Sequence, residues 1–179
     1  ASGAASAALG VGADASAENG VSIGSSALEL LLVELVRDGE VVVTLPGEKK
    51  LKTVVSLRVG EHDLSVSAFV IRNADENHAE YHRFLLRRNL RMRALAYAID
   101  NAGDVYVTGR FALAGVDADR LDEILGGVLE AADQPFNELL LIGFRTSMQK
   151  EWDWRVKNGE SLRNLEAFRR FLDHGDAAG

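Results

Sequence analysis

The alternation of hydrophobic and polar residues predicts a set of short strands. Residues 41–45, 51–59 and 64–72 have the two-residue periodicity of strands. In the last of them, one face consists of Leu64, Val66, Ala68 and Val70. The turn "GEHD" joins residues 51–59 to 64–72 as a hairpin, and "NAGD" joins a second hairpin made of 94–100 and 104–113.

Apolar residues spaced three or four apart predict five helices. The expected ranges are 27–38, 76–92, 117–132, 135–157 and 161–172. Residues suited to helix ends stand near these limits: Ser26 and Gly39 around the first helix, Asp75 or Asn73 before the second, Asp117 before the third and Pro135 at the fourth.

The resulting order, α-βββ-α-ββ-ααα, predicts an α+β domain over residues 27–175, with an antiparallel sheet of about five strands and helices packed on it. Residues 1–26 are mostly Ala, Gly and Ser, a composition that predicts a flexible tail. The tail contains Gly10-x-Gly12-x-x-Ala15, but no strand precedes this formal match to a dinucleotide motif, so it predicts no such site.

Composition limits the classes of function. The chain of 179 residues is 47% hydrophobic and has no cysteine, which excludes disulfides, iron–sulfur clusters and thiolate zinc sites. No apolar run is long enough to cross a bilayer, and nothing basic precedes Arg37 as a secretory signal would require. We therefore expect a cytoplasmic protein without a membrane partner.

The charge of the chain is acidic overall and unevenly distributed. A net charge of −7 disfavours a general nucleic-acid binder. Residues 70–93 nevertheless hold six arginines against three acids, whereas residues 114–140 hold seven acids against one arginine. This polarity predicts either an asymmetric contact with a partner or two ordinary solvated faces.

The stretch "DENHAEYHRFLLRRN", residues 75–89, resembles a metal-binding helix because His78 and His82 are four residues apart. A helical wheel places Glu80 on the opposite side from both histidines, which excludes the H-E-x-x-H arrangement of zinc peptidases. Tyr81 and Leu85 flank the histidine side, so we expect that side to face the sheet. His78, His82 and Asn89 would then form a polar seam.

Three interpretations of this seam remain open: a satisfied hydrogen-bond network, a pocket for a small ligand, or a metal site. A metal site formed by His78 and His82 would need a further ligand, for which His62, Asp63 and Asp100 are the candidates. The hydrogen-bond network is favoured, so we predict no metal and no cofactor.

Two other groups of side chains are candidates for interaction. Arg83, Arg87 and Arg91 follow one another at i, i+4 and i+8, a stripe that suits carboxylates or phosphates but also an ordinary solvated face. Trp152 and Trp154 lie about 200° apart on a helix, so one is expected to be buried. The other would pack beneath the last helix or contact a partner.

No pattern in the chain is specific for catalysis. There is no G-x-S-x-G elbow, and "LPGEKKLK" lacks the second glycine and the Lys-Ser/Thr ending of a phosphate-binding loop. We therefore predict no catalytic residues and a protein that is not an enzyme.

The segments "LPGEKKLKT", "DENH", "LLRRN" and "EWDWR" resemble the actinobacterial branch of the YbjN family, described as bacterial sensory transduction regulators, and the similarity extends over nearly all of residues 27–170. The resemblance implies a fold like that of type III secretion chaperones, contacts with a protein partner, and a homodimer. It implies no catalytic residues.

The leading hypothesis is accordingly a non-enzymatic regulatory or chaperone-like module that binds a protein partner. The alternatives are a metal- or small-ligand-binding protein that uses the His78/His82 face, or a nucleic-acid-linked regulator that uses Arg83, Arg87 and Arg91.

Overall fold

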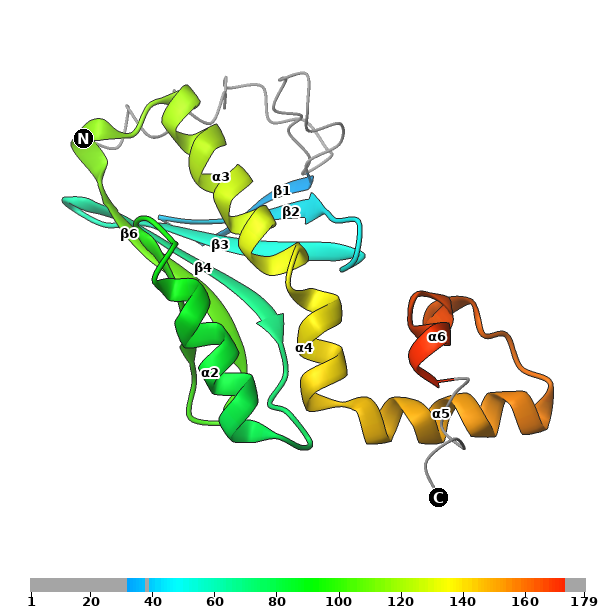
Figure 1. The fold of residues 1–179 in the computed structure, drawn as a ribbon. Helices are drawn as coiled ribbons and strands as arrows, with labels where there is room; N and C mark the ends of the chain where they lie inside the picture. Colours follow the sequence, from blue (N-terminus) through cyan, green and yellow to red (C-terminus); the bar gives the residue numbers. More distant parts are fainter. Residues whose placement is uncertain (1–31, 38, 173–179) are drawn as a thin grey trace.

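The computed structural model describes residues 32–37 and 39–172. The predicted tail, its Gly10–Ala15 motif, Ser26 and the start of the first predicted helix lie outside these residues. Six antiparallel strands form one sheet in the order β1-β2-β3-β4-β6-β5 (Figure 1). Their bounds are β1 (Leu32–Arg37), β2 (Glu40–Pro46), β3 (Lys52–Val59), β4 (Asp63–Ile71), β5 (Leu95–Ile99) and β6 (Val105–Ala112). The predicted α+β class with an antiparallel sheet is confirmed, with six strands instead of about five.

The additional strand corrects the prediction for residues 27–38, because residues 32–37 form β1 and not a helix. Gly39 has φ +76 and belongs to the short connection between β1 and β2 instead of ending a helix. This tight connection brings β1 against β2, with Leu32 opposite Thr44 and Leu35 opposite Val41. Pairing with β2 supplies backbone hydrogen bonds to residues 32–37. An isolated helix of this length would be only marginally stable, so the strand is favoured although the apolar residues have a helical spacing.

The remaining helices follow the predicted order; α2 is shorter than predicted, and α3 agrees with the prediction within one residue at each end. They are α2 (His78–Asn89), α3 (Ala118–Asp133), α4 (Phe136–Gly143), α5 (Arg145–Asn158) and α6 (Arg169–Leu172), with 3-10 turns η1 (Leu113–Gly115) and η2 (Arg163–Phe168). The predicted continuous helix 135–157 is wrong, because it bends at Phe144, whose φ of −140 is not helical. The predicted helix 161–172 is divided into the 3-10 turn η2 and the short helix α6.

The core lies between one face of the sheet and the helices α2, α3 and α4. Alternate residues of β4 are buried as predicted, with Leu64, Val66, Ala68 and Val70 at most 3% exposed. Tyr81 and Leu85 of α2 are buried in the same cluster, as is the apolar side of α3. Between them, Ser65 and Ser67 are half-buried and Phe69 is exposed on the other face. This face is the less covered one, as the sequence indicated.

The helix α5 extends away from the sheet, and α6 lies beside it (Figure 1). Trp152 is 5% exposed and belongs to the same core cluster as Phe168 and Leu172, whereas Trp154 is 54% exposed. The prediction that one tryptophan would be buried is therefore confirmed. In the parts of the chain described above, no helix combines the length and the apolar character needed to cross a membrane.

Candidate functional site

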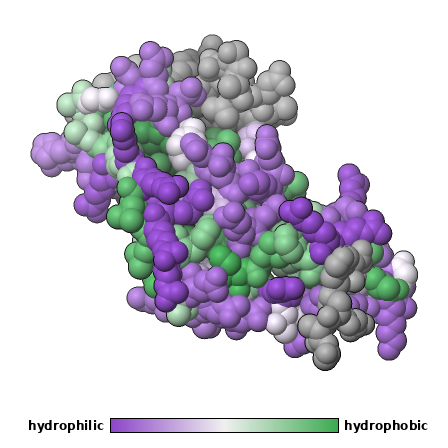
Figure 2. All heavy atoms as spheres, in the orientation of Figure 1, coloured by the Kyte–Doolittle hydropathy of each residue, from purple (hydrophilic) through white to green (hydrophobic). Residues whose placement is uncertain are grey.

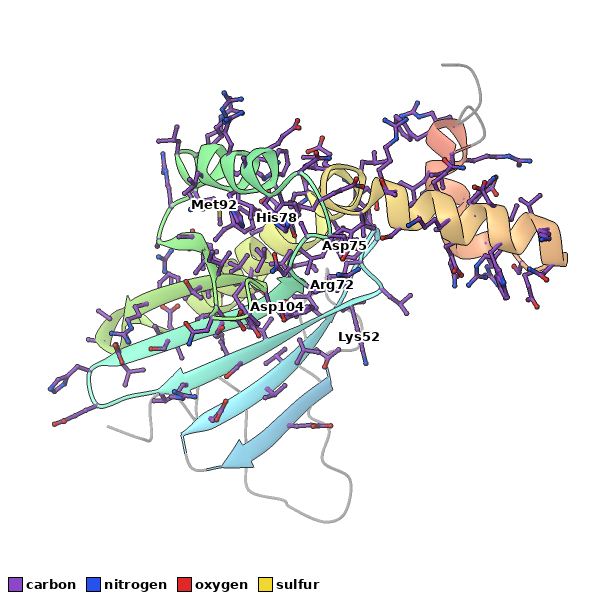
Figure 3. All side chains as sticks on the ribbon, turned by 90° about the horizontal axis from the view of Figure 1, so that it is seen from below. Lys52, Arg72, Asp75, His78, Met92 and Asp104 are labelled. Carbon is purple, nitrogen blue, oxygen red and sulfur yellow. The ribbon has the colours of Figure 1, made fainter. Side chains whose placement is uncertain are left out.

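The loop before α2 binds the junction between α4 and α5. Arg72 donates through Nη2 to Oδ2 of Asp75 at 2.8 Å, and Oγ of Ser147 in α5 donates to the same oxygen at 2.8 Å. The hydrogen bond from Arg72, and then that from Ser147, lower the pKa of Asp75 to about 2. The labelled Arg72 and Asp75 lie close together near this junction, and Met92 lies at the other end of α2 (Figure 3).

Glu76 and Asn77 complete this attachment. Both carboxylate oxygens of Glu76 accept hydrogen bonds from Thr146, from its backbone N–H and from its Oγ1, each at 2.7 Å. The side chain of Asn77 donates to the carbonyl of Ile142 at 3.0 Å. Glu76 thus satisfies a free N–H group in the first turn of α5. We call Asp75, Glu76 and Asn77, with their partners in α4 and α5, the junction clamp.

The N-cap of α2 differs from the prediction. Asn77 occupies this position with φ 54, and its side chain makes no capping hydrogen bond. Asn73, the other residue suggested as a cap, instead donates through its backbone N–H to Asp104 at 2.8 Å. The acidic part of "DENH" is therefore occupied in holding two distant segments together, which is a structural role.

The predicted polar seam does not form one network. His78 is exposed at the start of α2, although it was expected to face the sheet, and His82 is half-buried. Their ring centroids are 6.5 Å apart. Within the described residues, Nε2 of His82 is buried without a hydrogen-bond partner. The two histidines thus share a side of the helix without sharing an environment.

Asn89 has a separate role at the edge of the sheet. Its Oδ1 accepts from the N–H of Tyr97 in β5 at 2.8 Å, and its Nδ2 donates to the carbonyl of Tyr97 at 3.3 Å. Because β5 is an edge strand, Asn89 occupies backbone groups that would otherwise be open to a further strand.

The suggested metal ligands are not brought together. His62 lies in the turn between β3 and β4, Asp63 is the first residue of β4, and Asp100 lies after β5. Oδ1 of Asp100 accepts from the N–H groups of Ala102 and Asp104 at 2.9 Å each, as in an ordinary turn. Residues 32–37 and 39–172 contain no group of three or more His, Cys, Asp or Glu side chains suited to a metal ion.

The predicted arginine stripe is only partly helical. Arg83 and Arg87 lie on α2 and are exposed, but α2 ends at Asn89, so Arg91 stands in the following turn. Arg87 and Arg91 line an open groove of about 630 Å³ between α2 and α3, whereas Arg83 does not. The structure thus assigns two of the three arginines to a concave surface.

This basic groove has an apolar floor and one strongly charged wall. Its floor contains Phe84, Met92, Leu95 and Tyr97. Its wall contains Arg87, Arg88, Arg91 and Arg93, and Glu130 is the acidic residue that lines it from α3. The guanidinium of Arg88 lies 5.6 Å from the centre of the Phe84 ring. The other three arginines are exposed.

Two glycines lie in the interior of α3, and one of them, Gly127, lines the groove. Glycine lowers helix stability by about 1 kcal/mol relative to alanine, so Gly126 and Gly127 are unfavourable for α3 itself. A Cβ atom at Gly127 would stand 3.3 Å from Cδ1 of Leu95, and one at Gly126 would meet nothing within 4 Å. Gly127 therefore permits close approach of Leu95, and neither residue places a side chain in the groove.

The outer face of α2 beside this groove is apolar as well as basic. Leu86 is 65% exposed and Leu90 is 87% exposed. Figure 2 shows hydrophobic atoms among hydrophilic ones on the face that carries α2 and α3. None of the ion pairs found among the described residues involves Arg83, Arg87, Arg91 or Arg93. We call Leu86, Leu90 and the basic groove the α2 surface.

Sequence reasoning missed Arg88, Arg93 and the apolar floor. Arg88 follows Phe84 by four residues, so a helical wheel places them on one side of α2. The position of Arg93 and of the floor residues depends on β5 crossing beneath the end of α2. The sequence signal that could have indicated the groove is the charge asymmetry between residues 70–93 and 114–140, because α2 and α3 form its two walls.

The "LPGEKKLK" segment is held internally. The backbone N–H groups of Lys49 and Lys50 donate to Oδ1 of Asp133, at 2.9 Å and 2.8 Å. The Lys50 amine donates to the carbonyl of Phe69, and partial burial lowers the pKa of Lys50 to about 8. Asp133, only 8% exposed, thus fills the place that an external anion would need.

These observations describe an α+β protein with helices on one face of an antiparallel sheet and an open basic groove. The chain belongs to the YbjN family, "Putative bacterial sensory transduction regulator", whose model matches residues 25–141.

Mycobacterial proteins are similar along most of their length. Protein ML2442 of Mycobacterium leprae is 53% identical over 80% of this chain and 80% of its own length. Protein Rv0487 of Mycobacterium tuberculosis is 56% identical over 71% of this chain and 69% of its own. Both bear the description "uncharacterized".

Two solved structures share part of the arrangement. The ExsC–ExsE complex matches with 19% identity over 59% of this chain and 81% of the matched chain, at a TM-score of 0.44. The ExoU–SpcU complex from the type III secretion system of Pseudomonas aeruginosa matches with 14% identity over 57% and 84%, at 0.42.

Proposed function

We propose that this protein is a non-enzymatic regulatory module that binds another protein through the α2 surface. The observation that carries the proposal is the combination of two exposed leucines with arginines that have no acidic partner in the described residues. Exposed apolar patches rimmed by polar residues mark interaction sites, and arginine is enriched both at protein interfaces and among the residues that supply most of the binding energy.

The family membership supports the regulatory part of this proposal. A regulator in signal transduction acts by changing what another macromolecule does, and the description of the family names that kind of role. The cytoplasmic location and the homodimer predicted from the sequence remain predictions. A mass measured by light scattering tests the homodimer.

A pull-down with matched variants tests the proposed surface. The full chain would be tagged in its native cells and crosslinked, with Leu86→Ser/Leu90→Ser compared with Leu51→Ser. Leu51 is 89% exposed on the connection between β2 and β3, so its exposure matches that of Leu90. We expect the α2 double variant to lose the crosslinked partner and Leu51→Ser to retain it. Equal retention by both variants would contradict the proposal.

A further inference from the structure

The side chains that line the basic groove indicate what kind of molecule it binds. Three of its arginines, Arg87, Arg91 and Arg93, are exposed, and within residues 32–37 and 39–172 they have no carboxylate partner. Clustered like charges repel one another, and the planar guanidinium suits oxygen anions that accept two parallel hydrogen bonds. The wall of the groove is therefore complementary to carboxylates.

The floor of the same groove is complementary to an apolar side chain. Met92 and Leu95 are half-buried there, and Tyr97 is 8% exposed with its hydroxyl already donating to the carbonyl of Ala131 at 2.7 Å. Burial raises the pKa of Tyr97, so its hydroxyl stays neutral. With Tyr97 satisfied internally, the floor offers apolar contact more than polar contact, and methionine adapts readily to different shapes.

We infer that the basic groove binds an acidic segment of a partner protein, with an apolar side chain on the floor and carboxylates on Arg87 and Arg91. The inference rests on the proposed function and specifies the partner. A space of about 630 Å³ suits a few side chains of such a segment.

A protein segment fits this surface better than a nucleic acid does. The chain has a net charge of −7, and Glu130 lines the groove opposite the arginines. A long polyanion would pass over α3, whose exposed acids include Asp119, Asp122 and Glu123. A peptide can place its few carboxylates on one wall and avoid the other, whereas a phosphate backbone carries charge at every residue.

The test uses the full chain and a short fluorescein-labelled peptide with one central phenylalanine between glutamates. Control peptides carry Gln for Glu, or Ser for Phe. Fluorescence anisotropy is measured in about 50 mM and about 300 mM NaCl, where screening lengths differ about twofold. A labelled oligothymidylate of similar length serves as the nucleic-acid probe.

Two protein variants make the comparison specific. Arg87→Gln removes an arginine of the groove, and Arg83→Gln removes an exposed arginine one turn away on α2 that does not line it. We expect Arg87→Gln to weaken binding of the acidic peptide about three- to tenfold, and Arg83→Gln to change it less than about twofold. Both variants should keep the melting temperature of the parent chain.

Several outcomes would overturn the inference: equal losses in the two variants, equal binding of the Gln peptide, equal binding of the Ser peptide, or tighter binding of oligothymidylate. The proposed function can fail separately. If the acidic peptide does not bind while Leu86→Ser/Leu90→Ser still loses its cellular partner, the inference about acidic segments is wrong and the proposed surface stands.

Discussion

The two ends of α2 contrast in how their polar groups are used. At the start, Asp75, Glu76 and Asn77 all bind partners in Arg72, α4 or α5, at distances between 2.5 and 3.0 Å. At the end, Arg87, Arg91 and Arg93 stand exposed over an open groove, with Leu90 beside them. Asp75, Glu76 and Asn77 at the start are occupied by contacts within the chain, whereas the exposed arginines at the end face outward.

The contrast shows that a conspicuous cluster of polar residues is not necessarily a binding site. In the sequence, "DENH" resembles part of a metal-binding helix, yet in the structure its acidic residues form the junction clamp. The end of α2 looks like an ordinary charged helix, yet its groups are available to a partner. Availability depends on which segments pack against each end, and the bend at Phe144 decides this for the first end.

The largest expected effect comes from filling the space at the junction clamp. A Cβ atom at Gly143 would stand 2.8 Å from Cβ of Ala74 and 3.0 Å from the Tyr81 ring, so Gly143→Ala requires these groups to move. Overpacking of this kind costs about 1–3 kcal/mol. Urea unfolding followed by circular dichroism measures it.

Gly126→Ala is the matched control, because its Cβ would meet nothing within 4 Å and alanine favours the helix by about 0.5–1 kcal/mol. We expect opposite signs for the two Gly→Ala changes. Similar stabilisation by both would mean that the clamp is not tightly packed.

Removing the side chain that protects the edge strand should have the next largest effect. Asn89→Ala leaves the N–H and C=O of Tyr97 without the two hydrogen bonds from α2. This should lower the free energy of unfolding by about 1–2 kcal/mol. Hydrogen exchange at the Tyr97 amide should accelerate, and self-association should increase through the freed edge. Unchanged exchange at Tyr97 would contradict this role of Asn89.

Lowering the pH should weaken the hydrogen bonds at the start of α2 before it affects the end of this helix. The pKa of Asp75 is lowered to about 2 from an ordinary value of 3.8, so its contribution is complete above about pH 4 and disappears as the pH falls toward 2. The pKa of Glu76 is lowered as well, through its hydrogen bonds to Thr146.

Melting temperatures between pH 5 and pH 2.5 measure this effect. Asp75→Asn removes the titrating group, so the variant should start from a lower melting temperature and depend less on pH. Parallel curves for the variant and the parent chain would show that Asp75 is not linked to folding.

The smallest stability effect belongs to the open end. Arg83 and Arg87 are four residues apart on α2, and like charges at this spacing destabilise a helix by about 0.2–0.5 kcal/mol. Arg87 also lies in the last turn of α2, where a cation is favourable, so the two effects offset each other. Arg87→Gln should therefore leave stability nearly unchanged while it weakens partner binding. A clear loss of stability in urea unfolding would show that Arg87 has a structural role and weaken the contrast between the two ends.

The strands could be predicted from the sequence because their pattern is local. Leu64, Val66, Ala68 and Val70 alternate with Ser65, Ser67 and Phe69, and the two-residue period places the four on one face of the strand. Residues 32–37 could not be assigned in this way, since Leu32, Leu35 and Val36 suit a helical spacing and β1 depends on pairing with β2. The first turn of α5, after the bend at Phe144, likewise involves a long-range contact, because Glu76 lies 70 positions from its partner Thr146.

The candidate site was predictable only in part. Arg83, Arg87 and Arg91 were identified from their spacing, but the distinction between Arg83 and the other two requires the position of α3. His78 and His82 were correctly placed on one side of the helix, whereas the exposure of His78 depends on its place at the end of α2. Side-chain environments of this kind arise from tertiary packing, which periodicity alone does not contain.

A photo-crosslinking comparison shows whether a partner contacts the end of α2 and not its start. A photoreactive amino acid would replace Leu90 in one variant and Ala79, which is also exposed, in the other, both expressed as the full chain in native cells. We expect a discrete crosslinked protein from position 90 and none from position 79. Crosslinks from position 79 alone, or from neither position, would contradict it.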